Sequence, residues 1–149
     1  MTTDQAVRAM ALLMPRLVGR VKRTEVPEAL RSMSLAPRHL SLLSNLLIDG
    51  PLSVNVLAER LEVAPTTVSL MVSDLTRQGV LVRRTPADDR RRTIVAITDD
   101  EKTRKAIEDW LANGARAWRK AFEALSPSER AMFVATIRAY ENETALDLE

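Results

Sequence analysis

The sequence predicts a mainly helical α+β fold with a small three-stranded antiparallel sheet, and three observations support this fold class. Two short amphipathic helical patterns are separated by Ala64-Pro65. Gly79 is then followed by two β-type runs that flank a turn rich in Asp and Arg. Apolar residues at helical spacing also fill both ends of the chain. Helix, turn, helix and hairpin within residues 50–98 form the order of a winged helix-turn-helix, with further helices on either side.

The composition limits the class of protein. A chain of 149 residues with 46% hydrophobic and 28% charged residues is expected to form one domain or one compact two-lobed unit. It has no cysteine and one histidine, which argues against disulfides and against a metal site built on Cys or His. Because the chain has no membrane-length apolar run and no basic start of a signal peptide, we expect a cytoplasmic protein, without a cofactor.

The first helix is predicted over residues 4–24, because Val7, Met10 and Met14 recur at helical spacing. Pro15 interrupts this pattern. Since an interior proline removes one backbone hydrogen bond, we expect a kink or a restart of the helix just before it.

Proline and glycine delimit the next segments. Pro27 is expected to open a short turn, Pro37 to start a second helix, and Gly50-Pro51 to end that helix. The following Leu52-Ser53 is expected to form a short strand that pairs with the later hairpin. Leucines at helical spacing give the second helix its apolar face: Leu40, Leu43, Leu46 and Leu47.

The two central helices are predicted over residues 54–61 and 65–78. Ser53 is the expected N-cap of the first, and Pro65 occupies the first turn of the second, where its missing N–H removes no hydrogen bond. Gly79 ends the second helix. Its inward positions are Val68, Met71, Val72 and Leu75, and its outward positions are Thr66, Thr67, Ser69, Leu70, Ser73, Asp74 and Arg77.

The hairpin joins two β-type runs, residues 80–84 and 93–98, and carries most of the positive charge. Residues 65–92 hold six arginines and three aspartates, whereas the net charge of the whole chain is only +2. From Ala139 onward there are four acidic residues and no basic ones, so that end is unsuited to phosphate. Arginines stand at the base of the hairpin and near its tip: Arg83, Arg84, Arg90, Arg91 and Arg92.

Two capping boxes predict two helices after the hairpin. Thr98-Asp99-Asp100-Glu101 is expected to open a long helix, and Ser126-Pro127-Ser128-Glu129 to open the last one. The apolar stripe of the long helix is Ile107, Trp110, Leu111, Gly114, Trp118, Phe122 and Leu125. The stripe of the last helix is Met132, Phe133, Thr136, Ile137 and Tyr140.

The central block has side chains suited to contact with bases and phosphates. Thr66, Thr67 and Ser69 are small and hydroxylated, so a helix that starts with them can enter the major groove, which is about 12 Å wide. Arg90 and Arg91 are long enough to reach the adjacent minor groove. Each feature alone also fits ordinary capping or a solvated surface. Their joint arrangement favours binding to duplex DNA.

Six segments carry a resemblance to a known family: residues 35–37, 57–61, 65–69, 75–79, 88–91 and 95–100. In these segments the chain resembles the MarR family of bacterial winged helix-turn-helix transcriptional regulators. The most specific similarity is the Asp-x-Arg of the wing, at Asp89 and Arg91. The resemblance implies that this arginine probes the minor groove and that the aspartate helps hold the wing. We therefore expect DNA contacts from Thr66, Thr67, Ser69, Leu70, Arg77, Arg84, Asp89, Arg90 and Arg91.

Several positions depart from the family pattern. Leu70 stands where relatives commonly carry a basic residue, and Asp74 where an arginine is frequent. Leu70 suits a thymine methyl and Asp74 the amino group of cytosine, so altered specificity and weak binding both remain open. Ala36 and Ala64 replace the common Ser or Thr caps, which should weaken two helix starts by about 0.5–2 kcal/mol each.

The resemblance further implies a homodimer with interleaved terminal helices. Dimerisation regions at residues 1–34 and 99–149 then flank a DNA-binding domain at 35–98. The apolar stripes of the terminal helices lead to the same expectation, with an interface of Val7, Met10, Met14, Phe133, Ile137 and Tyr140. Such a dimer would bind a near-palindromic operator with half-sites about 10 base pairs apart, and would be nucleoid-associated when bound.

Family members often lose DNA affinity when a small aromatic or anionic molecule binds to them. Arg16, His39 and Trp110 are the candidate contacts for such an effector. Two of them also have an ordinary interpretation. Trp110 fits core packing, and His39 fits a partly exposed residue near the start of its helix.

Two other classes of function compete with DNA binding. The chain has no glycine-rich phosphate loop, no cysteine and no His-centred triad, so we expect no enzyme activity. The alternative is a winged-helix scaffold that binds proteins without specific DNA binding, and such binding should depend little on salt, whereas DNA binding weakens steeply. The arginine-rich wing favours DNA, and we expect a repressor rather than an activator.

Overall fold

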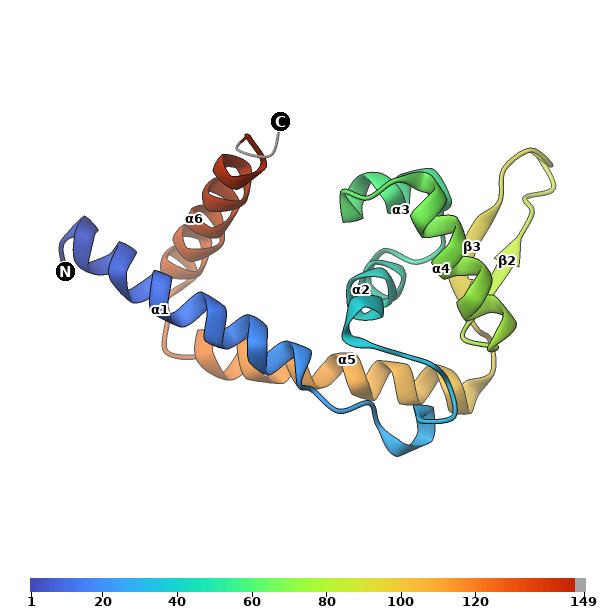
Figure 1. Ribbon diagram of the computed structural model, residues 1–149, viewed down its shortest axis with the longest axis horizontal. Coiled ribbons are helices and arrows are strands. Elements are labelled where there is room, and N and C mark those ends of the chain that lie inside the picture. Colours follow the sequence, from blue (N-terminus) through green and yellow to red (C-terminus); the bar gives the residue numbers. More distant parts are fainter. Residues whose placement is uncertain (147–149) are drawn as a thin grey trace. The chain divides into compact units, whose positions relative to one another are not determined.

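Residues 1–146 are described by a computed structural model, shown in Figure 1. They form six α-helices and three short strands. The chain divides into two compact units, Met1–Leu111 and Ala112–Glu149, and each is described by itself. Residues 147–149, the end of the predicted C-terminal region 99–149, lie outside the described residues. No helix in the described part has both the length and the apolar character needed to cross a bilayer.

Helix α1 spans Thr3–Lys22, close to the predicted residues 4–24. Thr2 caps it through a reciprocal capping box with Gln5, which the sequence analysis did not predict. Pro15 lies inside the helix without ending it, so the predicted restart does not occur. A proline removes a single backbone hydrogen bond, and the neighbouring bonds maintain the helix. No residue of α1 is buried.

Two 3-10 turns link α1 to the next helix, α2. The first, Glu28–Leu30, follows a proline as predicted. The second, Pro37–His39, replaces the predicted first turn of α2, which spans Leu40–Asp49. Ala36 has no side-chain oxygen to cap a regular helix, and its N–H donates instead to Nδ1 of His39 at 3.0 Å. The helix therefore begins later than the sequence pattern suggested.

The buried face of α2 differs in part from the predicted one. Leu42, Leu43 and Leu46 are buried, whereas Leu40 and Leu47 are partly buried against the core. Leu42 was not predicted to be buried, because the core covers a wider face of α2 than the single stripe of leucines indicates. Gly50, with a φ of +78°, follows the helix end as predicted.

Helices α3 (Val54–Leu61) and α4 (Pro65–Arg77) form the helix-turn-helix. The Oγ of Ser53 accepts the backbone N–H of Val56 at 3.3 Å, which confirms Ser53 as the cap of α3. Glu62 follows α3 in the left-handed region, with a φ of 52°. Ala64 offers α4 no side-chain cap.

The sheet has three antiparallel strands, as predicted, and their order is β1-β3-β2. The strands are β1 (Leu52–Ser53), β2 (Leu81–Arg84) and β3 (Ile94–Ile97). In the hairpin, Arg83 lies opposite Val95 and Arg84 opposite Ile94. Figure 1 shows the loop between β2 and β3 extending away from the sheet as a wing.

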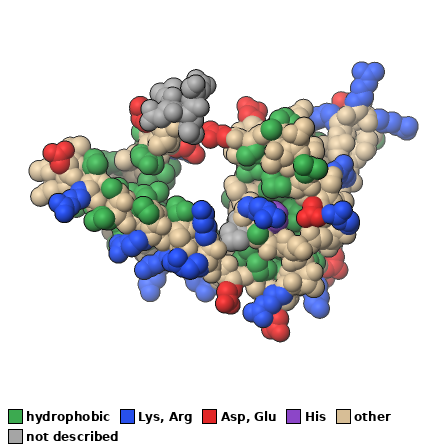
Figure 2. Space-filling view, viewed as in Figure 1, with side chains coloured by type: hydrophobic (Ala, Val, Ile, Leu, Met, Phe, Trp, Pro, Cys, Tyr) green, Lys and Arg blue, Asp and Glu red, His purple; other side chains and the backbone are tan. Residues whose placement is uncertain are grey.

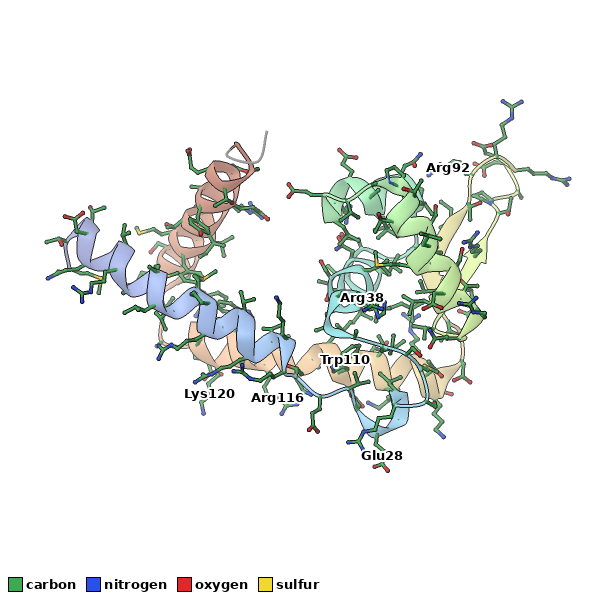
Figure 3. All side chains as sticks on the ribbon, viewed as in Figure 1. Glu28, Arg38, Arg92, Trp110, Arg116 and Lys120 are labelled. Carbon is green, nitrogen blue, oxygen red and sulfur yellow. The ribbon has the colours of Figure 1, made fainter. Side chains whose placement is uncertain are left out.

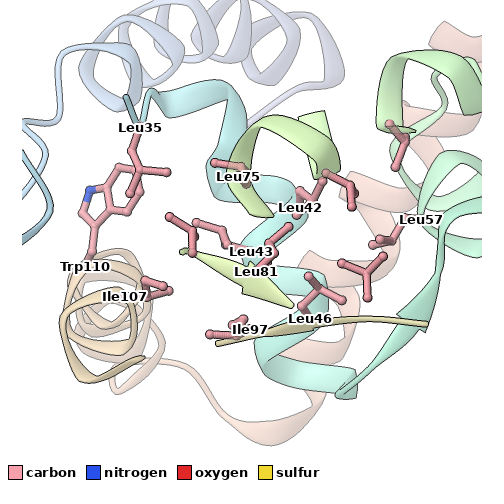
Figure 4. Packing of buried hydrophobic residues seen from close by; sticks show 14 of the residues in the cluster. Leu35, Leu42, Leu43, Leu46, Leu57, Leu75, Leu81, Ile97, Ile107 and Trp110 are labelled. Carbon is pink, nitrogen blue, oxygen red and sulfur yellow. The ribbon is translucent and has the colours of Figure 1, made fainter. Parts of the chain in front are cut away.

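One hydrophobic core unites α2, α3, α4, the sheet and the first half of α5 (Glu101–Phe122), as Figure 4 shows. Leu43 and Leu57 are fully buried in this core. Ile107 and Trp110 reach it from α5. Helix α4 and the strands that carry the wing are thus fixed to the same packed interior.

Helix α5 starts from a different cap than predicted. Oδ2 of Asp100 accepts the N–H of Thr103 at 2.9 Å, so Asp100 is the N-cap. Thr98, the predicted cap, still belongs to the hairpin: its N–H donates to the carbonyl of Val80 at 3.0 Å. Its Oγ1 accepts the N–H of Asp100 at 3.2 Å. The helix cannot begin until the chain has left the sheet.

The second unit contains the end of α5 and helix α6 (Pro127–Leu146). The predicted capping box is confirmed, because Oγ of Ser126 accepts the N–H of Glu129 at 3.3 Å and Oε2 of Glu129 accepts the N–H of Ser126 at 2.7 Å. Trp118, Phe122 and Phe133 form an aromatic cluster with ring centroids 5.4 to 5.7 Å apart. The three rings contact one another within this unit, although Trp118 is 52% exposed.

Replacing Asp100 with asparagine should lower the free energy of unfolding at neutral pH but not in strong acid. Hydrogen bonds from Thr103 lower the pKa of Asp100 below its usual 3.8. A carboxylate with a lowered pKa stabilises the fold above its unfolded-state pKa, and this contribution is lost as the pH falls through the folded-state value. Urea unfolding of both proteins at neutral pH and in steps below pH 3.8 measures the difference. A constant gap across that range would contradict this role.

Candidate nucleic-acid interface

The start of α4 presents small uncharged side chains to solvent. Thr66 and Thr67 are exposed in its first turn, and the side chain of Leu70 is 73% exposed one turn later. Ser69 is only half-buried at the edge of this face. Buried side chains at Val68 and further along hold the opposite face in the core. Hydroxyl and methyl groups suit base edges in the major groove, and the hydroxyls can also donate to phosphate oxygens.

The C-terminal end of α4 is held by a chain of polar contacts. Asp74 forms an ion pair with Arg77. The same carboxylate accepts a hydrogen bond from Nε2 of Gln78 at 3.1 Å, and Oε1 of Gln78 accepts the backbone N–H of Ser34. Both oxygens of Asp74 therefore have partners inside the protein, and a contact with cytosine would compete with them.

The two arginines at the base of the wing also have protein partners. Nη2 of Arg84 lies 2.8 and 2.9 Å from the two carboxylate oxygens of Asp99. Nη2 of Arg83 donates to Oγ of Ser73 on α4 at 2.6 Å. Neither arginine is buried. Their side chains connect the wing to the elements on either side of it.

The tip of the wing carries exposed arginines in a turn fixed by Asp89. Oδ1 of Asp89 accepts the N–H of Arg91 at 3.0 Å, and its carbonyl accepts the N–H of Arg92 at 3.2 Å. Arg90, Arg91 and Arg92 are exposed, and within residues 1–146 none of them forms an ion pair. Figure 2 shows this positive end of the wing in blue, and Figure 3 labels Arg92 there. Cationic groups without internal partners are available to phosphates.

Of the six residues predicted for a dimer interface, three are exposed on their helices and three are half-buried. In α1, Val7 is 62% exposed and Met10 37%, while Met14 is half-buried. In α6, Tyr140 is 59% exposed. Phe133 and Ile137, also in α6, are half-buried, and Phe133 packs in the aromatic cluster.

The three candidate effector contacts differ in accessibility. Arg16 is exposed on α1, whereas Trp110 is 2% exposed in the core, as its packing interpretation predicts. His39 is 1% exposed, so the expectation of a partly exposed residue was wrong. Burial lowers the pKa of His39 below its usual 6.5, nearby Arg38 lowers it further, and Asp74 opposes both effects. A neutral ring is consistent with Nδ1 accepting the hydrogen bond from Ala36.

Sequence reasoning missed the partners of the interface residues. The sequence gives no sign that Arg84 pairs with Asp99, that Arg83 pairs with Ser73 or that Gln78 contacts Ser34. These pairs are far apart in the chain, and no sequence periodicity marks them. No group of three or more potential metal ligands is present among the residues that the structure describes.

Comparisons with known proteins are consistent with this geometry. A model of the MarR family matches residues 33–92. The HTH-type transcriptional repressor MdtR of Bacillus subtilis (strain 168) is 29% identical to this chain over 99 residues, which are 66% of the chain. The match spans 63% of the length of that repressor.

Solved structures share the fold over most of the chain. A MarR family protein from Bacillus stearothermophilus aligns with a TM-score of 0.62 at 21% identity, covering 97% of this chain and 99% of the other. Bordetella bronchiseptica BpsR, whose DNA binding is regulated by 6-hydroxynicotinic acid, aligns with a TM-score of 0.59 at 20% identity, covering 89% of this chain and 98% of the other. The predicted fold class is confirmed. The chain is similar to the MarR family of winged helix-turn-helix transcriptional regulators: the family model matches residues 33–92, and a solved MarR family structure shares its fold.

Proposed function

We propose that this protein is a homodimeric repressor that binds a near-palindromic DNA operator. The observation that carries this proposal is the pairing of an uncharged hydroxylated face on α4 with a wing tip whose arginines have no internal ion pair among the described residues. The match to the repressor MdtR supports it. In the cell, the protein would act in the cytoplasm at the nucleoid.

In the proposed complex the recognition helix enters the major groove and the wing enters the adjacent minor groove. Thr66, Thr67, Ser69 and Leu70 then face base edges, with the Leu70 side chain suited to a thymine methyl. Arg77, at the far end of α4, contacts the backbone while still paired with Asp74. Arg90 and Arg91 reach the narrow, electronegative minor groove from the tip that Asp89 shapes.

The proposed dimer interface uses the exposed apolar side chains of α1 and α6. No residue of α1 is buried, although this helix carries Val7, Met10, Leu13, Leu17 and Val21. A two-fold dimer that covers these side chains would remove apolar surface from water. It would also present two copies of α4 to successive major-groove faces of one duplex.

A small aromatic or anionic effector that weakens DNA binding is part of the proposal, and the regulation of BpsR by 6-hydroxynicotinic acid supports it. Arg16 is available to such a molecule, whereas His39 and Trp110 are accessible only if the core around them opens. Nε1 of Trp110 is buried and has no hydrogen-bond partner within residues 1–146, so it has a donor to offer. An effector needs to favour one dimer geometry by about 1 to 3 kcal/mol.

The proposal is tested by titrating the purified protein with fluorescent DNA from its own upstream region and with a scrambled duplex, between about 50 and 200 mM salt. We expect tighter binding to the upstream DNA and a loss of affinity of about tenfold or more over that range. Binding that ignores both sequence and salt would argue against a DNA regulator and for a protein-binding scaffold.

A further inference from the structure

The arginines of the wing fall into two groups that differ in their partners. At the tip, Arg90 and Arg91 are exposed and form no ion pair within the described residues. At the base, Arg84 is bound to both oxygens of Asp99, and Arg83 is bound to Oγ of Ser73. The sequence predicts Arg84 as a DNA contact. Its pairing with Asp99 indicates a different role.

The base arginines reach opposite sides of the hairpin. Arg83 and Arg84 are consecutive residues of β2, so their side chains leave the strand on opposite faces. On one face Arg83 joins the wing to α4, which carries Ser73. On the other face Arg84 joins it to Asp99, directly before the cap of α5. The base of the wing is therefore held from both faces.

This arrangement matters because the tip is far from the sheet. The hairpin beyond Arg84 and Ile94 has no further strand pairing, and a two-stranded ribbon is only marginally stable by itself. The position of the tip relative to α4 therefore depends on how the base is held. If α4 lies in the major groove, this position decides whether the tip reaches the minor groove.

We propose that Arg83 and Arg84 are positioning residues, which set the wing against α4 and α5, and that they are not phosphate contacts. This inference rests on the proposed DNA-binding function. The tip arginines then supply the ionic contacts, and the base arginines supply the geometry in which both grooves are reached together.

Salt dependence separates the two roles. The logarithm of the binding constant falls with the logarithm of salt concentration, with a slope of about −0.9 for each phosphate neutralised. Loss of one phosphate contact per protomer should therefore reduce the slope of a dimer by about 1.8. Loss of a positioning residue should weaken binding and leave the slope unchanged.

The experiment compares Arg84→Ala, Asp99→Asn and the double variant with Arg90→Ala, the control for loss of an ionic contact at the wing tip. The probe is one duplex, selected by the wild-type protein from a random pool. We expect Arg84→Ala and Asp99→Asn each to weaken binding by about two- to tenfold with an unchanged slope, and the double variant to bind no more weakly than either single one. Arg90→Ala should reduce the slope. A second pair, Arg83→Ala and Ser73→Ala, should behave like the first.

Asp99→Asn is the decisive variant. It makes the protein more positive, so if Arg84 contacted a phosphate, freeing it from Asp99 would tighten binding and Arg84→Ala would reduce the slope. That pair of results would overturn the inference and leave the proposed function standing. A wild-type protein that selects no duplex would overturn both. Thermal unfolding should be nearly unchanged in all variants, because the paired groups are exposed.

Discussion

Replacing Arg91 with alanine is expected to weaken binding to the selected duplex by at least about tenfold, while the protein stays dimeric. The Arg91 side chain is exposed at the wing tip, and its backbone N–H is held by Asp89. The substitution therefore removes the guanidinium and keeps the hydrogen bond that shapes the tip. In the proposed dimer the substitution removes one contact from each of the two wings. Fluorescence anisotropy measures the affinity, and light scattering measures the mass.

Arg31→Ala is the matched control for this prediction. Arg31 is an exposed arginine outside the wing, next to the first 3-10 turn, and its loss changes the net charge equally. We expect less than about a twofold effect on affinity, since a general change in charge is largely screened at physiological salt. If both variants lose affinity equally, or Arg91→Ala binds like the wild type, Arg91 does not have a specific role at the minor groove.

Replacing Leu43 with alanine is expected to lower the free energy of unfolding by about 2 to 5 kcal/mol. Leu43 is fully buried in α2 and lies in the core that also contains residues of α4 and α5. Removing its side chain takes away buried apolar surface and leaves a cavity in a closely packed interior. Urea unfolding, followed by circular dichroism at one protein concentration, gives the difference.

Ile48→Ala provides the comparison in the same helix. The Ile48 side chain is 80% exposed, so its truncation leaves no cavity and should change the free energy of unfolding by less than about 0.5 kcal/mol. Equal destabilisation by the two substitutions would show that burial in this core does not determine the stability of the protein.

Local signals predicted the order of the fold well, because they depend on neighbouring residues. The structure contains four predicted features: the N-cap at Ser53, the capping box at Ser126, the helix end at Gly50 and the small sheet. Errors occur where tertiary structure overrides the local signal. The N-cap of α5 is Asp100 and not the predicted Thr98, because the N–H of Thr98 donates to the carbonyl of Val80 in the hairpin.

The burial of His39 is a second case in which tertiary structure overrides the local sequence signal. Its position near a helix start suggested partial exposure, but the core closes over it. The arginines of the wing can be identified from the sequence alone. Their division into paired and unpaired groups depends on Asp99 and Ser73, which lie near them only in the folded chain. Sequence predicted which residues are cationic, and the structure shows which of them have protein partners.

Glu62, in the turn between α3 and α4, has a left-handed backbone conformation, which limits the residue types that this position tolerates. This region costs a non-glycine residue about 1 to 2 kcal/mol, and here it lets the N–H of Val63 donate to the carbonyl of Ala58 at 3.1 Å. Leu57 of α3 and Val68 of α4, on either side of this turn, are both fully buried in the core. If α4 reads DNA as proposed, a substitution in the core beneath this turn would therefore change the orientation of the side chains that contact the bases.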